Sequence, residues 1–213
     1  MAASDPDKLR TTLLRASWMS ILVGIAIELA LLALAAGSGS WTSWKPVVAD
    51  LVQKVSWSTI VCVGLAIGTG AARSRAATMG GLGLLAAPLA FAAARSLHKG
   101  AASALSLSGP GGAFPYGIAL LKALEYACLG AALGRLSTRA ARARAYVSVG
   151  LACALTFGTS IVVVMAAGAA KPLETSDVVA RSVNELLFPV GCSLVLYAAG
   201  SLGKRLSPEP APS

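Results

Sequence analysis

The sequence is poor in charged and aromatic side chains. Of its 213 residues, 13% are charged and 6% are aromatic. A soluble domain carries roughly a quarter charged residues, so the shortage excludes the ordinary soluble globular class. His98 is the only histidine, which excludes a bis-histidine haem, a histidine-based zinc site and a histidine-based catalytic triad.

Cysteine is also scarce, and its spacing is not that of a metal site. Cys62, Cys128, Cys153 and Cys192 all lie within apolar runs, and none belongs to a CxxC pair. Buried free cysteine behaves as a small hydrophobe, and this spacing does not indicate a disulfide framework. We also find no P-loop, dinucleotide-binding fingerprint or nucleophile constellation. The sequence therefore predicts a protein that is not an enzyme and uses no metal and no cofactor.

Long apolar runs are what the sequence has in abundance, with 56% hydrophobic residues and a mean hydropathy of +0.72. A helix needs about 20 apolar residues to cross the hydrocarbon core of a bilayer. We predict an all-α, polytopic membrane protein with short loops. It would comprise a cytoplasmic N-terminus (1–16), a membrane domain (17–203) and a short cytoplasmic tail (204–213). Its six spans are predicted at about 17–37, 55–72, 77–95, 114–134, 146–169 and 182–203.

The net charge of +9 is explained by topology rather than by nucleic-acid binding, because the basic residues flank the apolar runs in short clusters. One side of the membrane would hold Lys8, Arg10, Arg15, Arg73, Arg75, Arg135, Arg139, Arg142, Arg144, Lys204 and Arg205. The other side would hold only Lys45, Lys54, Arg95, Lys99, Lys171 and Arg181. Basic loops stay in the cytoplasm, so both termini are predicted to be cytoplasmic in an inner or plasma membrane. The lipid bilayer is the predicted partner, and the loop Arg135–Arg144 is a candidate surface for a protein partner.

Two segments near the N-terminus allow more than one interpretation. The stretch Ala33–Ala35 fits a signal-peptidase site, but the apolar run is long and contains Glu28, so we expect the first span to be retained. The segment 41–57 is amphipathic, with Pro46 suited to a first helical turn. We interpret it as an interfacial helix that leads into the second span. A partner-binding patch is the alternative.

Charged residues within the spans are the candidate functional site. Lys122 and Glu125 are three residues apart and share one helix face, and Glu28 lies near the middle of the first span. A charge at the bilayer centre costs about 2.5–3.5 kcal/mol on insertion scales. We therefore expect an intramembrane cluster with Lys122 between Glu28 and Glu125, acting either as a structural ion pair or as a proton or cation relay. Glu185 is interpreted as paired with Arg181 or solvated.

Small residues and prolines indicate how the spans pack. Gly64 with Gly68, and Gly130 with Gly134, form GxxxG patterns that allow close helix approach. Pro88 and Pro189 are expected to kink the third and sixth spans. Short matches between the two halves of the chain, such as "ELALLALAAG" and "EYACLGAALG", suggest a 3+3 inverted repeat of the kind found in many transporters.

Three functional classes fit these features. The first is a transporter or channel for a small solute or ion, with the Glu28, Lys122 and Glu125 cluster near the midplane. The second is a membrane-bound regulator that sequesters a soluble cytoplasmic factor, as anti-sigma proteins do. The third is a non-catalytic subunit of a larger membrane complex, and a homo-oligomer also fits the sequence.

The basic asymmetry predicts the orientation of the chain. An alkaline phosphatase fused after Ser213 should be inactive, because the enzyme folds only outside the cytoplasm. A fluorescent protein fused at the same position should be bright. Phosphatase activity at Ser213 would reverse the predicted topology.

Overall fold

The computed structural model describes residues 6–39, 43–71, 74–108, 115–139, 141–169 and 174–205, and all regular structure within these ranges is helical. The helices are α1 (Pro6–Gly37), α2 (Trp44–Gly68), α3 (Arg75–Ala104), α4 (Tyr116–Thr138), α5 (Ala143–Cys153), a π-helical turn η1 (Ala154–Gly158), α6 (Thr159–Ala167) and α7 (Thr175–Arg205). Six helical segments are long and apolar enough to cross a membrane, with α5, η1 and α6 forming one of them. The six-span prediction is confirmed in this respect, and the fold is compatible with a multi-pass membrane protein.

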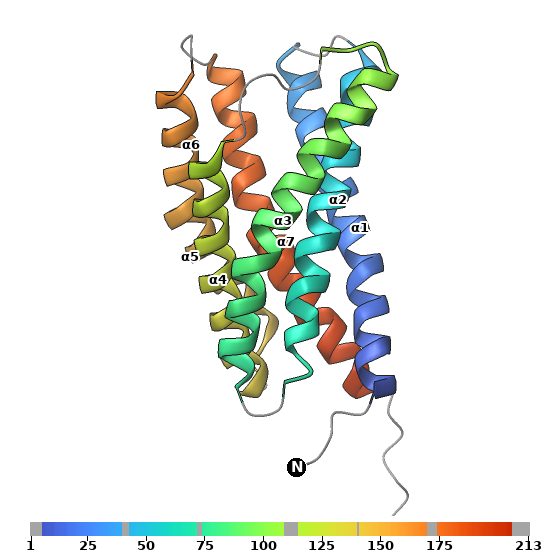
Figure 1. Ribbon diagram of the computed structural model, residues 1–213, viewed down its shortest axis with the longest axis vertical. Coiled ribbons are helices and arrows are strands. Elements are labelled where there is room, and N and C mark those ends of the chain that lie inside the picture. Colours follow the sequence, from blue (N-terminus) through green and yellow to red (C-terminus); the bar gives the residue numbers. More distant parts are fainter. Residues whose placement is uncertain are drawn as a thin grey trace, which may run out of the picture.

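The segments pack as a bundle in which each one lies beside its neighbours in sequence (Figure 1). Contacts run from α1 through α2, α3 and α4 to α5, and α7 closes the ring by packing on α5 and α1. Smaller contacts join α2 and α4 to α7. α1 begins and α7 ends at the same end of the bundle, which we call the terminal end (Figure 1). The opposite end is called the distal end.

Several helix boundaries differ from the predicted spans. α3 continues to Ala104, so residues 96–104, which follow the predicted third span (77–95), are still helical. α2 is one continuous helix from Trp44, where Ser43 Oγ accepts a hydrogen bond from the Lys45 N–H at 3.4 Å, so the predicted interfacial helix is not a separate element. An apolar run marks only the apolar part of a helix. The helix itself continues into polar residues as long as its backbone hydrogen bonds are satisfied.

Two charged residues near the start of α2 contact charged or ionisable groups of neighbouring helices. Lys54 is only 12% exposed and pairs with Glu28 of α1, and Asp50 lies 3.5 Å from His98 Nε2 of α3. On the other side of the helix, Trp44 is 57% exposed. An amphipathic pattern shows only that one face is polar, and here that face meets polar groups of neighbouring helices.

The predicted packing glycines lie where α3 meets its two neighbours. A Cβ added at Gly64 would lie 2.7 Å from Ala86 Cβ, and one at Gly68 would lie 2.9 Å from Met79 Cα. On α4, a Cβ at Gly130 would lie 2.3 Å from the Met79 carbonyl oxygen. A Cβ at Gly134 would lie 2.6 Å from Ala76 Cα. The absence of side chains lets the three backbones approach closely, which is how helices associate in lipid.

Pro88 and Pro189 lie inside α3 and α7, and both helices continue through them. The 3+3 repeat and the orientation of the bundle in a membrane stay predictions. The predicted tail beyond Arg205, the first five residues and the side chains of Lys8, Lys204 and Arg205 lie outside the described residues.

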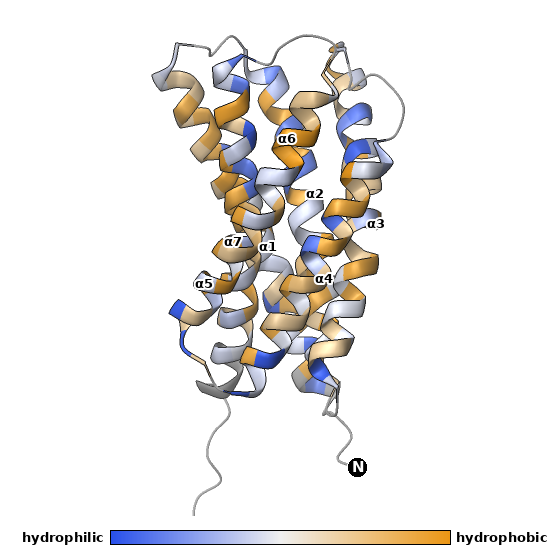
Figure 2. Cartoon of the chain, turned by 90° about the vertical axis from the view of Figure 1, so that its left-hand side faces the viewer, coloured by the Kyte–Doolittle hydropathy of each residue, from blue (hydrophilic) through white to orange (hydrophobic). Residues whose placement is uncertain are grey.

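The hydropathy of the bundle differs between its two halves. Many large apolar side chains are exposed on the outside, among them Trp18, Leu85, Leu89 and Leu120. Hydrophilic segments lie at both ends and also within the distal half of the helices (Figure 2). In the terminal half, the buried side chains include the apolar Leu65, Met79, Leu129 and Leu133. The buried ion pairs of Glu28 with Lys54 and of Lys122 with Glu125 and Glu185 lie in the distal half.

The contact at Gly130 gives a stability test. Replacing Gly130 by Ala should destabilise the bundle by about 1–3 kcal/mol, because the new methyl group meets the backbone of α3 rather than a movable side chain. Gly117→Ala, on the same helix, is the matched control, since nothing lies within 4 Å of its added Cβ. Thermal unfolding in detergent would measure both, and equal melting temperatures for the two variants would contradict the close packing.

Candidate functional site

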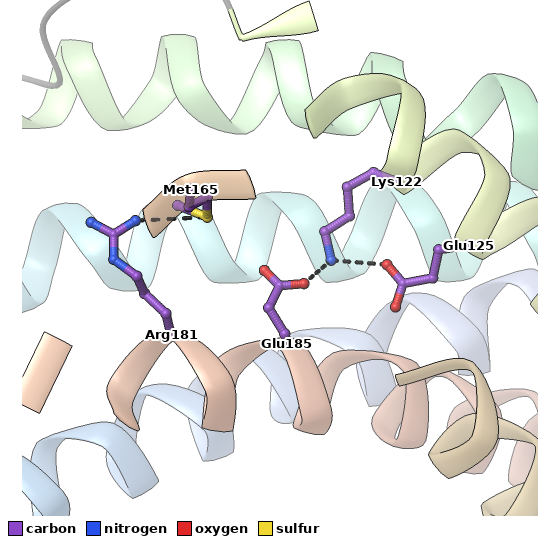
Figure 3. A network of polar contacts seen from close by, with 5 residues as sticks. All are labelled: Lys122, Glu125, Met165, Arg181 and Glu185. Carbon is purple, nitrogen blue, oxygen red and sulfur yellow. Dashed lines mark hydrogen bonds and ion pairs between the residues drawn. The ribbon is translucent and has the colours of Figure 1, made fainter. Parts of the chain in front are cut away.

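A buried ion-pair triad lies where α4 faces α7. Lys122 Nζ donates to Glu125 Oε2 at 3.0 Å, within α4, and to Glu185 Oε2 across the bundle on α7. The three side chains are only 6%, 0% and 12% exposed, in the order Lys122, Glu125 and Glu185. Figure 3 shows the ammonium group between the two carboxylates. The pairing of Lys122 with Glu125 follows from their i, i+3 spacing.

Glu28 is not part of this triad, contrary to the predicted cluster. Its Oε2 lies 2.5 Å from Lys54 Nζ, which joins α1 to α2. Both side chains are nearly buried, at 7% and 12% exposure. The prediction placed Lys54 just outside the second span and gave Lys122 as the cation that balances Glu28. Because α2 begins earlier than predicted, Lys54 lies inside the bundle and balances Glu28.

Glu185 was interpreted wrongly as paired with Arg181 or solvated. Glu185 as a whole is 9% exposed, and its ion-pair partner is Lys122. The Arg181 guanidinium instead lies 3.7 Å from Met165 Sδ of α6 (Figure 3). α7 starts seven residues before the predicted span, at Thr175 rather than 182. Glu185 is therefore about 15 Å along the helix from its start, at 1.5 Å per residue.

A cluster of four aromatic side chains packs beside the triad. Trp57 of α2 packs edge-on against Phe91, Tyr126 and Phe188, with ring centroids 6.3, 5.6 and 6.3 Å away. Lys122 Nζ lies 5.5 Å from the Trp57 ring centroid and 5.9 Å from that of Tyr126. These distances are within the range of cation–π attraction. The rings therefore stabilise the ammonium group on the side that the carboxylates leave open.

A cavity of about 410 Å³, which we call the vestibule, lies on the distal side of this aromatic group. Glu185 and Lys122 line it, while Trp57, Phe91 and Phe188 form its apolar lining. Most of the lining residues come from the distal parts of their helices, and Trp57 and Phe188 lie near the helix middles. Asp50 and Asp177 are well exposed, so the vestibule opens at the distal end. Its polar lining consists of Asp50, Gln53, Lys54, Arg95, Lys122, Asp177, Arg181, Asn184 and Glu185.

The fifth span contains a π-helical turn beside the triad. A Cβ at Gly158, the last residue of η1, would lie 3.1 Å from Glu185 Cβ. π-turns inside α-helices occur often at functional sites. No pattern in the sequence predicts this turn. Gly158 lets the fifth span approach α7 at the level of Glu185.

No group of three His, Cys, Asp or Glu side chains in the described ranges is arranged to hold a metal ion. The four cysteines are unpaired thiols, of which Cys62 and Cys192 are buried. The polar chemistry of the interior therefore rests on two ion-pair groups, the triad and the pair of Glu28 with Lys54.

No protein-family model, curated protein or solved structure matches this chain. The class that the fold supports is a helical protein with six potential membrane spans. A more specific function has to be argued from the vestibule and the triad.

Removal of Lys122 tests the triad. Breaking one partner of a buried ion pair typically costs about 3–5 kcal/mol, because the remaining charge is left without compensation. Lys122→Met should therefore lower the folded yield and the melting temperature in detergent.

Adding Glu125→Gln and Glu185→Gln to Lys122→Met should restore much of the loss, since no buried charge then remains in the triad. Adding Glu28→Gln instead should restore nothing, because Glu28 pairs with Lys54. A Lys122→Met protein as stable as the parent would show that the triad does not stabilise the fold.

Proposed function

We propose that this protein is a transporter for a small charged solute, which binds in the vestibule next to Lys122 and Glu185. The observation that carries the proposal is a cavity of about 410 Å³ that leads from the distal end to buried, oppositely charged groups. Small-molecule sites typically measure about 300–1,000 Å³ and combine apolar walls with a few placed polar groups. The vestibule has both properties.

Burying an ionisable side chain inside a membrane domain costs free energy, so such residues are rare there. Those that occur typically mark substrate or ion pathways. Packing alone does not require seven charged residues around one cavity. An apolar filling of similar volume is often as stable as a buried ion pair or more so. The charges of the vestibule are therefore better explained by a charged ligand than by stability.

The vestibule is open toward one end only. Trp57 and Phe188 are each 6% exposed and separate it from the apolar interior of the terminal half. A transporter that works by alternating access has a conformation with this asymmetry, in which the site faces one side of the membrane. A continuously open channel would instead need a polar path through Leu65, Leu129 and Leu133, which are fully buried. The geometry thus favours a transporter over a channel.

Cysteine accessibility tests whether the vestibule contains water. In a variant with the four native cysteines replaced, Ile118→Cys and Asn184→Cys should react with a membrane-impermeant thiol reagent added on the distal side. The matched control is Leu120→Cys, on the same helix as Ile118 but 61% exposed on the outside of the bundle. The reagent should modify Leu120→Cys at least tenfold more slowly than Ile118→Cys, because lipid excludes the reagent.

The same variants identify the solute. Small charged solutes would be screened for slowing the modification of Asn184→Cys, and protective solutes would then be tested for counterflow in proteoliposomes. Saturable counterflow supports transport. Equal, slow modification of Ile118→Cys and Leu120→Cys would contradict the proposal. Protection without counterflow would instead indicate a ligand-binding regulator or complex subunit.

A further inference from the structure

The charges of the triad do not balance. One ammonium group, on Lys122, faces two carboxylates, on Glu125 and Glu185, so the fully ionised triad carries one negative charge in excess. By contrast, the pair of Glu28 with Lys54 balances one carboxylate with one ammonium group. The excess charge is confined to the triad.

The groups packed around the triad do not supply the missing positive charge. The other titratable side chains close to Glu125 are Tyr126 on α4, Cys153 on α5 and Cys192 on α7, which are a phenol and two thiols. α2 contributes the indole of Trp57. Two further cations of the vestibule have other partners among the described residues. Lys54 pairs with Glu28, and the Arg181 guanidinium lies against Met165 Sδ.

The hydrogen bonding of Glu125 also indicates that positive charge is missing from the triad. Its Oε1 is buried and has no hydrogen-bond partner among the described residues, and the side chain is 0% exposed. Burying an ionised carboxylate without full compensation is far more costly than burying a neutral, partly bonded group. A bound proton would remove the excess charge without needing additional space.

A metal ion is a poorer candidate than a proton for this charge. Hard cations require several oxygen ligands, and the described residues around the triad provide only two carboxylates. Glu125 also lies behind the vestibule and does not line it. A proton needs one oxygen only, and Oε1 of Glu125 is available.

The two carboxylates are not equivalent. Glu185 lines the vestibule, is 12% exposed and pairs with Lys122. Glu125 is fully buried and has one oxygen without a partner. The ionised form is therefore better stabilised on Glu185, and the proton is better placed on Glu125.

We infer that Glu125 holds one exchangeable proton, which enters and leaves through the vestibule past Glu185 and Lys122. On binding, an O–H bond forms at Glu125 from a proton delivered by water in the vestibule. On release, the same bond breaks and the proton returns to water. A charged solute that contacts Lys122 or Glu185 changes the charge balance of the triad, so solute binding and proton binding are coupled. The coupling rests on the proposed transport function, whereas the proton site does not.

Infrared spectroscopy of the full-length protein in lipid at neutral pH tests the proton directly. The parent should show the carbonyl band of one protonated carboxyl group, and the band should shift when H₂O is replaced by D₂O. Glu125→Gln should remove it. Glu185→Gln should remove it as well, because Glu125 would then ionise to balance Lys122. Glu28→Gln is the matched control and should leave the band unchanged, since its carboxylate is balanced by Lys54.

Absence of the band in the parent would overturn the inference, as would a band that survives Glu125→Gln or does not shift in D₂O. A band retained in Glu185→Gln would contradict the charge balance as its cause. If a substitution at Glu185 prevents folding, the comparison of the parent with Glu125→Gln and Glu28→Gln still decides whether the proton exists. The two proposals can fail separately. If the carbonyl band is present but the vestibule cysteines do not react, the transport function is refuted and the proton site stands. If the solute shows counterflow but the parent has no carbonyl band, the proton site is refuted and the transport function stands.

Discussion

The ion pairs of Lys122 with Glu125 and Glu185 join two helices that otherwise contact each other little. α4 and α7 touch at few points, and the contact from Lys122 to Glu185 bridges them on the distal side of the Trp57 aromatic group. The contact requires α7 to present Glu185 at the level of Lys122. Gly158 of η1 then lets the fifth span pack against the same residue. The positions of three spans thus depend on one cation.

The remaining helices are joined by a different kind of force. α3 approaches α2 and α4 through glycine and alanine, where backbones meet without intervening side chains. Van der Waals contact of this kind requires small residues at the positions where the two backbones meet. In the distal half, charged and aromatic side chains are also buried, and the helices leave the vestibule between them.

This division gives the bundle a closed half and an open half, separated by Trp57 and its aromatic neighbours. A solute that enters from the distal end would reach Lys122 and Glu185 before it meets the rings. The charged groups that the solute contacts are also those whose balance determines whether a proton is bound. Ligand recognition and ion coupling would therefore share the same three side chains, with Glu185 toward the vestibule and Glu125 behind it.

The amino-acid sequence by itself determined the helical class, the six spans and the pairing of Lys122 with Glu125, because apolar length and i, i+3 spacing are local properties. It also indicated that Gly64, Gly68, Gly130 and Gly134 are suited to close packing. Only the tertiary structure decided that Glu28 pairs with Lys54 and that Glu185 completes the triad. Both contacts join residues of different helices, and no local pattern encodes which helices meet or at what depth. The vestibule likewise exists only because several helices each direct their polar face toward the same space.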